Sequence, residues 1–308
     1  MFEKTFKDFN LNFNALIESN TFSSGDLMTG QISFELSKVT KIRSITMCMS
    51  GKADVHWSYG SGKHRRTYHA KIDFFNLKSM ILQEGAVGGP APLPPGRHVY
   101  SFACQIPQGD FPSSFRGPYG QIVYNLTVAI DRPWHMSKDF VTQLNFVHHV
   151  DSNQPELMSP LSGSNSSSLS CISGPITMTA SVGKKGFTRG ETIRIICNFS
   201  NASSRTVTPK AKLKQKQKYY TREGIQRRLI VKKLDSVTGL PISAHTEETH
   251  TEMMLTIPAE SSLTISNCSL LHVEYEIELS LCQRASPDLT VLFPIVLCDT
   301  PLRPHYVD

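Results

Sequence analysis

Apolar and polar residues alternate with a period of two along most of this chain. The clearest run is residues 122–131, where five apolar side chains share one face: Ile122, Tyr124, Leu126, Val128 and Ile130. Because successive side chains of a β-strand point to opposite faces of its sheet, this run predicts a long strand with one buried face. Residues 112–120, rich in Pro and Gly, predict a tight loop that fixes where the strand enters the core.

The same alternation predicts further strands in two groups. In the first group we expect strands at 9–13, 30–36, 42–59, 68–75, 99–106 and 140–150, with a bend at Gly51. The pattern restarts later in the chain, with strands at 176–182, 193–199, 273–281 and 291–297. The last of these is almost wholly apolar, which predicts that both of its faces are covered.

No segment of ten or more residues shows a helical period, so the sequence predicts an all-β protein. Many short strands in two groups are typical of two immunoglobulin-like β-sandwich domains. The 308 residues suit two domains. We expect a sandwich at 1–150, a Ser- and Pro-rich linker at 151–174, a second sandwich at 175–299 and a short tail at 300–308.

The composition is that of a globular protein, with 39% hydrophobic and 19% charged residues. No run approaches the roughly 20 apolar residues of a membrane helix, and the first residues lack the apolar core of a signal peptide. We therefore expect a cytoplasmic protein. The seven cysteines are scattered without a CxxC pair, which favours reduced, mostly buried thiols.

Motifs for catalysis or metal binding are missing from the sequence. It contains no HExxH, no GxSxG and no Cys/His cluster with zinc-like spacing. His148 and His149 are neighbours on a predicted strand and would point to opposite faces, so they do not suit one ion. The run 245–250, HTEETH, resembles a solvated polar loop. We expect no enzyme activity, no cofactor and no metal site.

Positive charge is concentrated in one part of the chain. The net charge is +6, but residues 205–233 carry eleven Lys and Arg against Glu223, a local +10 that leaves about −4 for the rest (6 − 10). Lysine recurs there at every second position: Lys210, Lys212, Lys214, Lys216 and Lys218. On a strand these five ammonium groups would share one face.

Two interpretations of this lysine series remain open. It is either a solvated strand whose charge prevents edge-to-edge aggregation, or a surface that binds an acidic partner. Such a partner would be a phosphorylated receptor tail, an acidic cargo segment or an anionic membrane surface. Nucleic acid is disfavoured, because aromatic residues interleave with the lysines only at Tyr219 and Tyr220.

A second, smaller basic cluster contains Lys63, His64, Arg65 and Arg66. It falls on the tip of a predicted loop between two strands. Loop tips often present contacts to partners, although many basic tips are only solvated. Arg65 and Arg66 are therefore candidate partner-binding residues beside the five lysines.

Two sequence runs resemble the signature of the arrestin family, particularly the α-arrestins or arrestin domain-containing proteins. They are LPPGRHVYSFACQIP at 93–107 and PSSFRGPYGQIVY at 112–124. The second half is similar to the same family in GPITMTASVGKKGFTRGETIRI at 174–195 and HVEYEIELS at 272–280. The resemblance covers nearly the whole chain. It implies two arrestin-type β-sandwiches joined by a short hinge.

The resemblance also implies a function. Arrestin relatives recognise phosphorylated or acidic cargo tails through basic surfaces. The implied role is a non-enzymatic adaptor that binds cytoplasmic regions of membrane receptors or transporters for endocytosis and sorting, at the plasma membrane and endosomes.

One feature of the family is not found in this sequence. Typical α-arrestins carry a C-terminal tail with PPxY motifs that bind WW domains of HECT ubiquitin ligases. This sequence contains no PPxY, which argues against ligase recruitment. Two alternatives therefore remain open: a tailless competitor of longer α-arrestins, and a retromer-type coat subunit, since those subunits share the arrestin fold.

Overall fold

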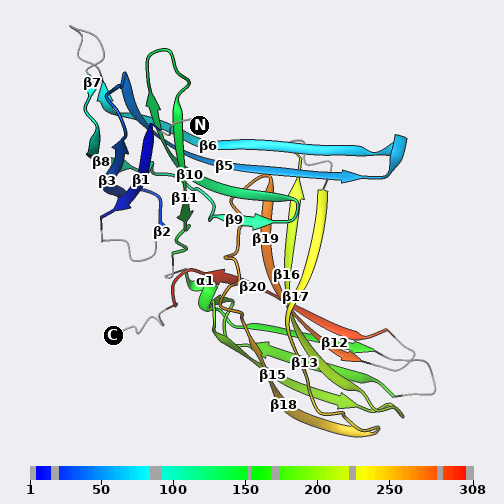
Figure 1. Ribbon diagram of the computed structural model, residues 1–308. Helices are drawn as coiled ribbons and strands as arrows, with labels where there is room; N and C mark the ends of the chain where they lie inside the picture. Colours follow the sequence, from blue (N-terminus) through cyan, green and yellow to red (C-terminus); the bar gives the residue numbers. More distant parts are fainter. Residues whose placement is uncertain are drawn as a thin grey trace, which may run out of the picture. The chain divides into compact units, whose positions relative to one another are not determined.

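The computed structural model describes residues 5–14, 21–83, 92–151, 154–167, 174–221, 227–282 and 287–302. The chain forms two compact units, the first built from residues up to His148 and the second from most of the chain after it. Within the described residues, helix is limited to α1 (Pro155–Met158) and the short 3-10 turn η1 (Gly62–His64). Everything else that is regular is strand, which confirms the predicted all-β class (Figure 1).

The first unit is a sandwich of two main sheets. One has the order β1-β3-β8 and the other β2-β11-β10-β5-β6, with β9 paired to β10, while β4 and β7 form a separate small ribbon. Phe9 of β1 stacks on Phe140 of β11 with ring centroids 3.7 Å apart, so the core lies between the two sheets. The strands are β1 (Phe6–Phe13), β2 (Thr21–Phe22), β3 (Leu27–Leu36), β4 (Thr40–Lys41), β5 (Ser44–Tyr59), β6 (Arg66–Gln83), β7 (Pro92–Leu93), β8 (Gly96–Gln105), β9 (Phe115–Gly117), β10 (Gly120–Asp131) and β11 (Lys138–Phe146).

Strand β10 is the centre of this unit, as its alternating pattern indicated. It pairs with β5, β9 and β11, and its apolar face is fully buried. The Tyr124 hydroxyl donates a 2.6 Å hydrogen bond to the carbonyl of Pro112, which ties the preceding loop to the strand. A β-bulge follows Gly51 on β5, and a Cβ on Gly51 would lie only 2.5 Å from the Tyr124 ring. The ring therefore requires glycine on the neighbouring strand.

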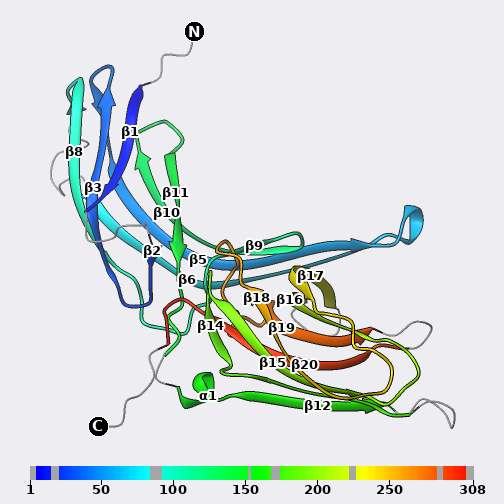
Figure 2. The same ribbon diagram turned by 90° about the horizontal axis from the view of Figure 1, so that it is seen from below.

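The second unit is also a sandwich, with sheet orders β12-β13-β15-β18 and β14-β20-β19-β16-β17 (Figure 2). The two sheets approach closely, since a Cβ on Gly163 of β12 would lie 2.6 Å from a methyl group of Val291 on β20. The strands are β12 (Leu161–Ser167), β13 (Ile176–Val182), β14 (Gly186–Thr188), β15 (Thr192–Asn201), β16 (Thr208–Tyr220), β17 (Arg227–Thr238), β18 (Thr246–Thr256), β19 (Leu271–Cys282) and β20 (Leu289–Cys298).

The expectation of an irregular linker at 151–174 is wrong for much of that stretch. It contains α1 and β12, and β12 pairs with β13 over seven residue pairs. The serines of β12 concealed the strand because it is the edge of its sheet, where backbone hydrogen bonds to one neighbour suffice without an apolar alternation. Residues 152–153 and 168–173 lie outside the described residues.

Three smaller expectations also need correction. Residues 245–250 are mostly strand β18, not a loop, since their backbone pairs with β15 while their polar side chains face outward. Leu292 of β20 is 51% exposed, so only one face of that strand is covered. Tyr59, the last residue of the strand predicted at 42–59, is 68% exposed and not buried in the core, because β5 continues past its sheet at this point.

Residues 85–96 are rich in Gly and Pro, a composition typical of irregular structure. Those up to 91 lie outside the described residues. Pro92 and Leu93 form β7 and pair with Lys41 and Thr40 of β4.

Candidate partner-binding surfaces

The five lysines predicted to share a face do so on β16, and we call them the lysine ladder: Lys210, Lys212, Lys214, Lys216 and Lys218. The residues between them point into the core, and Ala211, Leu213, Gln215 and Gln217 are all buried. The two glutamines are satisfied inside the core, where Gln215 donates to the Tyr275 hydroxyl at 2.6 Å and Gln217 donates to Gln215 at 2.6 Å. The alternation therefore gave the right orientation for the whole strand.

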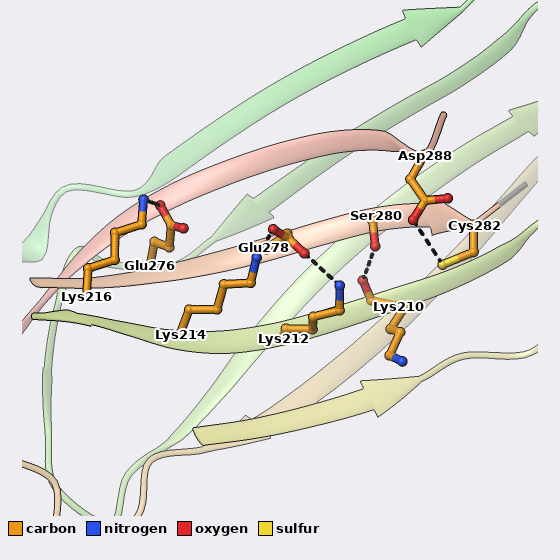
Figure 3. A network of polar contacts seen from close by, with 9 residues as sticks. All are labelled: Lys210, Lys212, Lys214, Lys216, Glu276, Glu278, Ser280, Cys282 and Asp288. Atoms are coloured by element: carbon orange, nitrogen blue, oxygen red, sulfur yellow. Dashed lines mark hydrogen bonds and ion pairs between the residues drawn. The ribbon is translucent and has the colours of Figure 1, made fainter. Parts of the chain in front are cut away.

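The lysine ladder is not an open row of cations, because the neighbouring strand β19 carries carboxylates on the same face (Figure 3). Each of four lysines reaches a glutamate of β19. The ion pairs are Lys212–Glu278 at 2.7 Å, Lys214–Glu278, Lys216–Glu276 at 2.5 Å and Lys218–Glu274 at 2.5 Å. Residues about 60 positions later in the sequence thus neutralise most of the ladder.

Electrostatics keep these groups charged. Burial acts to raise the pKa of Glu278, but hydrogen bonds from Lys212 and Lys214 outweigh it and hold that pKa below its ordinary value. The hydrogen bond to Glu278 likewise raises the pKa of Lys212 against the effect of burial. The face carries five lysines and three glutamates, a net +2 (5 − 3).

Lys210 differs from the other four lysines. Its ammonium group makes no ion pair with any residue that the structure describes, and Figure 3 shows it directed away from Glu278. Its neighbour across the strands is Ser280, whose hydroxyl donates to the Lys210 carbonyl at 3.3 Å. The ladder's free positive charge is therefore concentrated at this end.

The second predicted cluster forms the tip of the β5–β6 hairpin, and we call it the basic tip: Lys63, His64, Arg65 and Arg66. Strand β10 pairs with β5 only as far as Val55, so the last residue pairs of the hairpin, such as Tyr59 with Arg66, have no third strand from the described part of the chain paired beside them. All four side chains of the basic tip are exposed.

The basic tip lacks the internal neutralisation of the ladder. Arg65 donates to the Ser58 hydroxyl at 3.2 Å, and Lys63, Arg65 and Arg66 form no ion pair with any described residue. The two predicted clusters therefore differ: most lysines of the ladder are paired with carboxylates, whereas Lys63, Arg65 and Arg66 of the basic tip have no such partner among the described residues.

The histidine pair offers no metal site. The His148 ring lies 3.6 Å from Asp110 and the His149 ring 2.5 Å from Asp299, so the two rings have separate partners. His250 lies 2.7 Å from the Asn198 side chain. Across the described ranges there is no group of three or more His, Cys, Asp or Glu residues that could hold a metal ion.

The buried cysteines Cys197 and Cys298 are poor nucleophiles. Six lie in the described part of the chain and all are free thiols, with Cys197, Cys268 and Cys298 buried. Burial raises the pKa of Cys197 to about 12 and that of Cys298 to about 11, so neither is a thiolate near neutral pH. Cys171 lies outside the described residues.

A membrane-spanning helix is not found in the part of the chain that the structure describes.

The pairing of the β19 glutamates with the lysine ladder was not predicted from the sequence. Glu274, Glu276 and Glu278 share one face of β19, but alternation alone does not say which strand lies beside it. The signal was the equal spacing of two oppositely charged runs, lysine on one strand and glutamate on another, which suits cross-strand pairing.

Comparison with known proteins extends the structural evidence. The family described as "Arrestin (or S-antigen), N-terminal domain" matches residues 9–153, and "Arrestin (or S-antigen), C-terminal domain" matches residues 172–302. Thioredoxin-interacting protein of Rattus norvegicus is 28% identical over 304 residues, which is 96% of this chain and 75% of the relative. Arrestin domain-containing protein 4 of Mus musculus is 27% identical over 289 residues, 91% of this chain and 69% of the relative. Each of the two sandwiches is matched by one of these arrestin domains, and the chain belongs to the arrestin family of adaptor-type proteins.

Proposed function

We propose that this protein is a non-catalytic adaptor that binds acidic or phosphorylated cytoplasmic segments of membrane receptors or transporters and supports their endocytosis and sorting. The observation that carries this proposal is the presence of both arrestin domains, over residues 9–153 and 172–302. Arrestin-family proteins in general bind cytoplasmic regions of receptors or transporters.

The basic tip is the first contact that we assign to an acidic segment. Its cations are exposed and have no carboxylate partners among the described residues, so an incoming anion displaces only water. The guanidinium groups of Arg65 and Arg66 suit the planar, two-point recognition of carboxylates and phosphates. Tyr59, 68% exposed on the same hairpin, offers an aromatic surface beside these charges.

The lysine ladder is the second contact. Its net charge of +2 attracts an acidic segment, but four of its lysines already pair with glutamates. A phosphorylated segment would have to compete with Glu274, Glu276 and Glu278 for them. Lys210, without such a pair, is the position at which binding begins in this proposal.

A direct test measures binding of a multiply phosphorylated serine peptide and its unphosphorylated form to the full chain by fluorescence anisotropy. R65Q/R66Q should weaken binding of the phosphorylated peptide by roughly tenfold at low salt, because two charge-assisted contacts are lost. K232Q/K233Q removes the same charge from exposed positions on β17 and should change binding less than about twofold. Equal losses in both variants would show that only net charge matters and would contradict the assignment to the basic tip.

Capture of the protein from cells, followed by mass spectrometry, separates the adaptor role from the alternatives. Recovery of membrane receptors or transporters that depends on Arg65 and Arg66 supports the adaptor. A stable stoichiometric partner without membrane cargo would instead favour a retromer-type coat subunit. Cargo recovered without a HECT ubiquitin ligase would favour a competitor of the longer α-arrestins.

A further inference from the structure

The turn between β10 and β11 carries the most exposed aromatic side chain among the described residues. Trp134 is 100% exposed, and Met136, two residues later, is 91% exposed. The turn projects from the end of its sheet (Figure 1). We call residues 132–138 the tryptophan turn.

The backbone of the tryptophan turn adopts an unfavourable conformation at Trp134. The His135 amide donates to the Arg132 carbonyl at 3.4 Å, which makes Pro133 and Trp134 the central residues of a turn. Trp134 has a φ of +61°, a conformation that favours Gly or Asn at this position and costs a bulky residue free energy. Because the indole contacts no core that would offset this cost, folding gives no reason for a tryptophan here, and such a site is a candidate for function.

The other tryptophan shows the contrast. Trp57 is 4% exposed and stacks on Tyr68 with ring centroids 5.6 Å apart. Its role in packing is plain. Trp134 has no comparable role within its own unit.

A basic hollow lies beside the tryptophan turn. Its volume is about 700 Å³, and its walls include Lys38, Lys41 and Arg132, with Val39 and Trp134 at the same site. None of the described residues that line it carries a carboxylate. Asp131, which directly precedes the turn, is already paired with Arg43 at 3.1 Å. The hollow therefore suits an anion.

Arg132 supplies a second indication of an anionic ligand. Its Nε is buried and donates no hydrogen bond, although its guanidinium lies 5.1 Å from the centre of the Phe6 ring. A buried donor without an acceptor is costly, and a shift of the Arg132 guanidinium toward a ligand in the hollow that it lines would bring Nε to an acceptor. Lys138, at the other end of the turn, adds a further cation.

We propose that the tryptophan turn docks this protein on an anionic lipid bilayer. Trp134 and Met136 enter the headgroup region, and the hollow formed by Lys38, Lys41 and Arg132 receives a lipid phosphate. Tryptophan prefers the membrane interface because its ring is apolar and its N–H is polar. Basic residues beside it add attraction to the negative surface of anionic lipids.

A peptide ligand at the tryptophan turn and a membrane contact at the lysine ladder both fit the geometry less well. A peptide partner would need an apolar recess or an open strand edge to hold it, whereas Trp134, which lines the hollow, is 100% exposed to solvent. The lysine ladder is a weaker membrane surface, since its lysines are paired with glutamates. The proposal is separate from the adaptor role and does not rest on it.

The chain provides its own probe, because it contains only two tryptophans and one of them is buried. Vesicles of phosphatidylcholine with phosphatidylserine should shift the emission of Trp134 to shorter wavelength, while pure phosphatidylcholine vesicles should not. In W134F only Trp57 remains, so the shift should disappear while the emission of Trp57 reports an intact fold.

Sedimentation with the same vesicles measures the affinity. W134A/M136A should weaken binding by roughly tenfold, through lost interfacial contact, and K38Q/K41Q by at least as much at low salt. The matched controls are L240A, which removes an 85% exposed side chain elsewhere, and K232Q/K233Q, which removes two exposed lysines. Both controls should bind like the unchanged protein.

Three results would overturn the proposal. The first is unchanged Trp134 emission with phosphatidylserine vesicles at low salt, and the second is W134A/M136A binding as tightly as the unchanged protein. The third is an equal emission shift with inorganic phosphate or a phosphopeptide in the absence of vesicles, which would assign the hollow to a soluble ligand. Neither readout involves Arg65 or Arg66, so failure here and failure of the adaptor proposal are distinguishable.

Discussion

The lysine ladder and the basic tip appear alike in the sequence and differ in the structure. The ladder lies on β16, beside a strand whose glutamates pair with four of its five lysines. The basic tip lies on a hairpin that runs past its sheet, where no third strand among the described residues pairs with it to supply a carboxylate. The comparison shows that strand order, rather than local charge, decides whether a basic cluster is available to a partner.

Removal of the glutamates should convert the ladder into an open basic surface. E274Q/E276Q/E278Q breaks four ion pairs and leaves five lysines on one face. We expect the free energy of unfolding in urea to fall by about 2 kcal/mol at low salt, from roughly 0.5 kcal/mol per pair with like-charge repulsion added. Heparin should then bind the variant more tightly than the unchanged protein.

The control for this variant is E252Q, which breaks the exposed pair of Arg194 and Glu252 on the other sheet of the same unit. It should lower the free energy of unfolding far less than the triple variant does, because this single pair is exposed to solvent. Added salt should restore part of the stability of the triple variant, since salt screens repulsion between the lysines. An unchanged urea midpoint would mean that the lysines are solvated independently of the glutamates.

The fold could be predicted from the sequence wherever one face of a strand is apolar. Alternation identified β10 and β19. The two-residue period of the lysines correctly gave one shared face on β16, and Gln215 and Gln217, which lie between the lysines, are buried on the opposite face. It failed for β12 and β18, where backbone pairing supports strands whose exposed side chains are polar. Period-two patterns report burial, so strands that bury little remain unseen.

The candidate sites were less predictable than the fold. The lysines could be placed on one face, but their partners depend on the register between β16 and β19, which brings Lys212 opposite Glu278 from 66 positions away. Trp134 gave no periodic signal, because it lies in a turn and its exposure follows from backbone geometry. Register and turn conformation are properties of the folded chain, and local sequence does not determine them.

Acid should weaken the second unit through the ladder. The pKa of Glu278 is lowered in the folded state, so its contribution to stability is complete above its ordinary value of 4.5 and is lost as pH falls through the lower folded value. The free energy of unfolding should therefore decrease below about pH 4.5, and E278Q should reduce that decrease. Urea titrations between pH 3 and 7, in roughly unit steps, measure the difference. The same slope in both proteins would contradict the pairing.

Alkaline pH should lower the free energy of unfolding through Lys212, the partner of Glu278. The pKa of Lys212 is raised, so its contribution is present below the ordinary value of 10.5 and is lost as pH rises through the higher folded value. K212Q should remove that contribution and cost up to about 1 kcal/mol at pH 7, whereas K210Q should cost less than about 0.3 kcal/mol because Lys210 has no ion pair within the described residues. Equal costs would mean that the ion pairs of the ladder add nothing to stability.

The smallest expected effect on stability comes from giving the basic tip a carboxylate of its own. Ser58 accepts a hydrogen bond from Arg65, so S58E places a carboxylate beside that guanidinium and imitates the ladder on the hairpin. The new pair is exposed, and we expect the free energy of unfolding to rise by no more than about 0.5 kcal/mol. Binding of the phosphorylated serine peptide should nevertheless fall several-fold, because the peptide must now compete with an internal carboxylate.

T177E, which adds the same charge at an exposed position on β13, controls for net charge and should leave binding unchanged. If S58E and T177E weaken binding equally, the partner responds to the overall charge of the protein and not to an unpaired cluster at the hairpin tip.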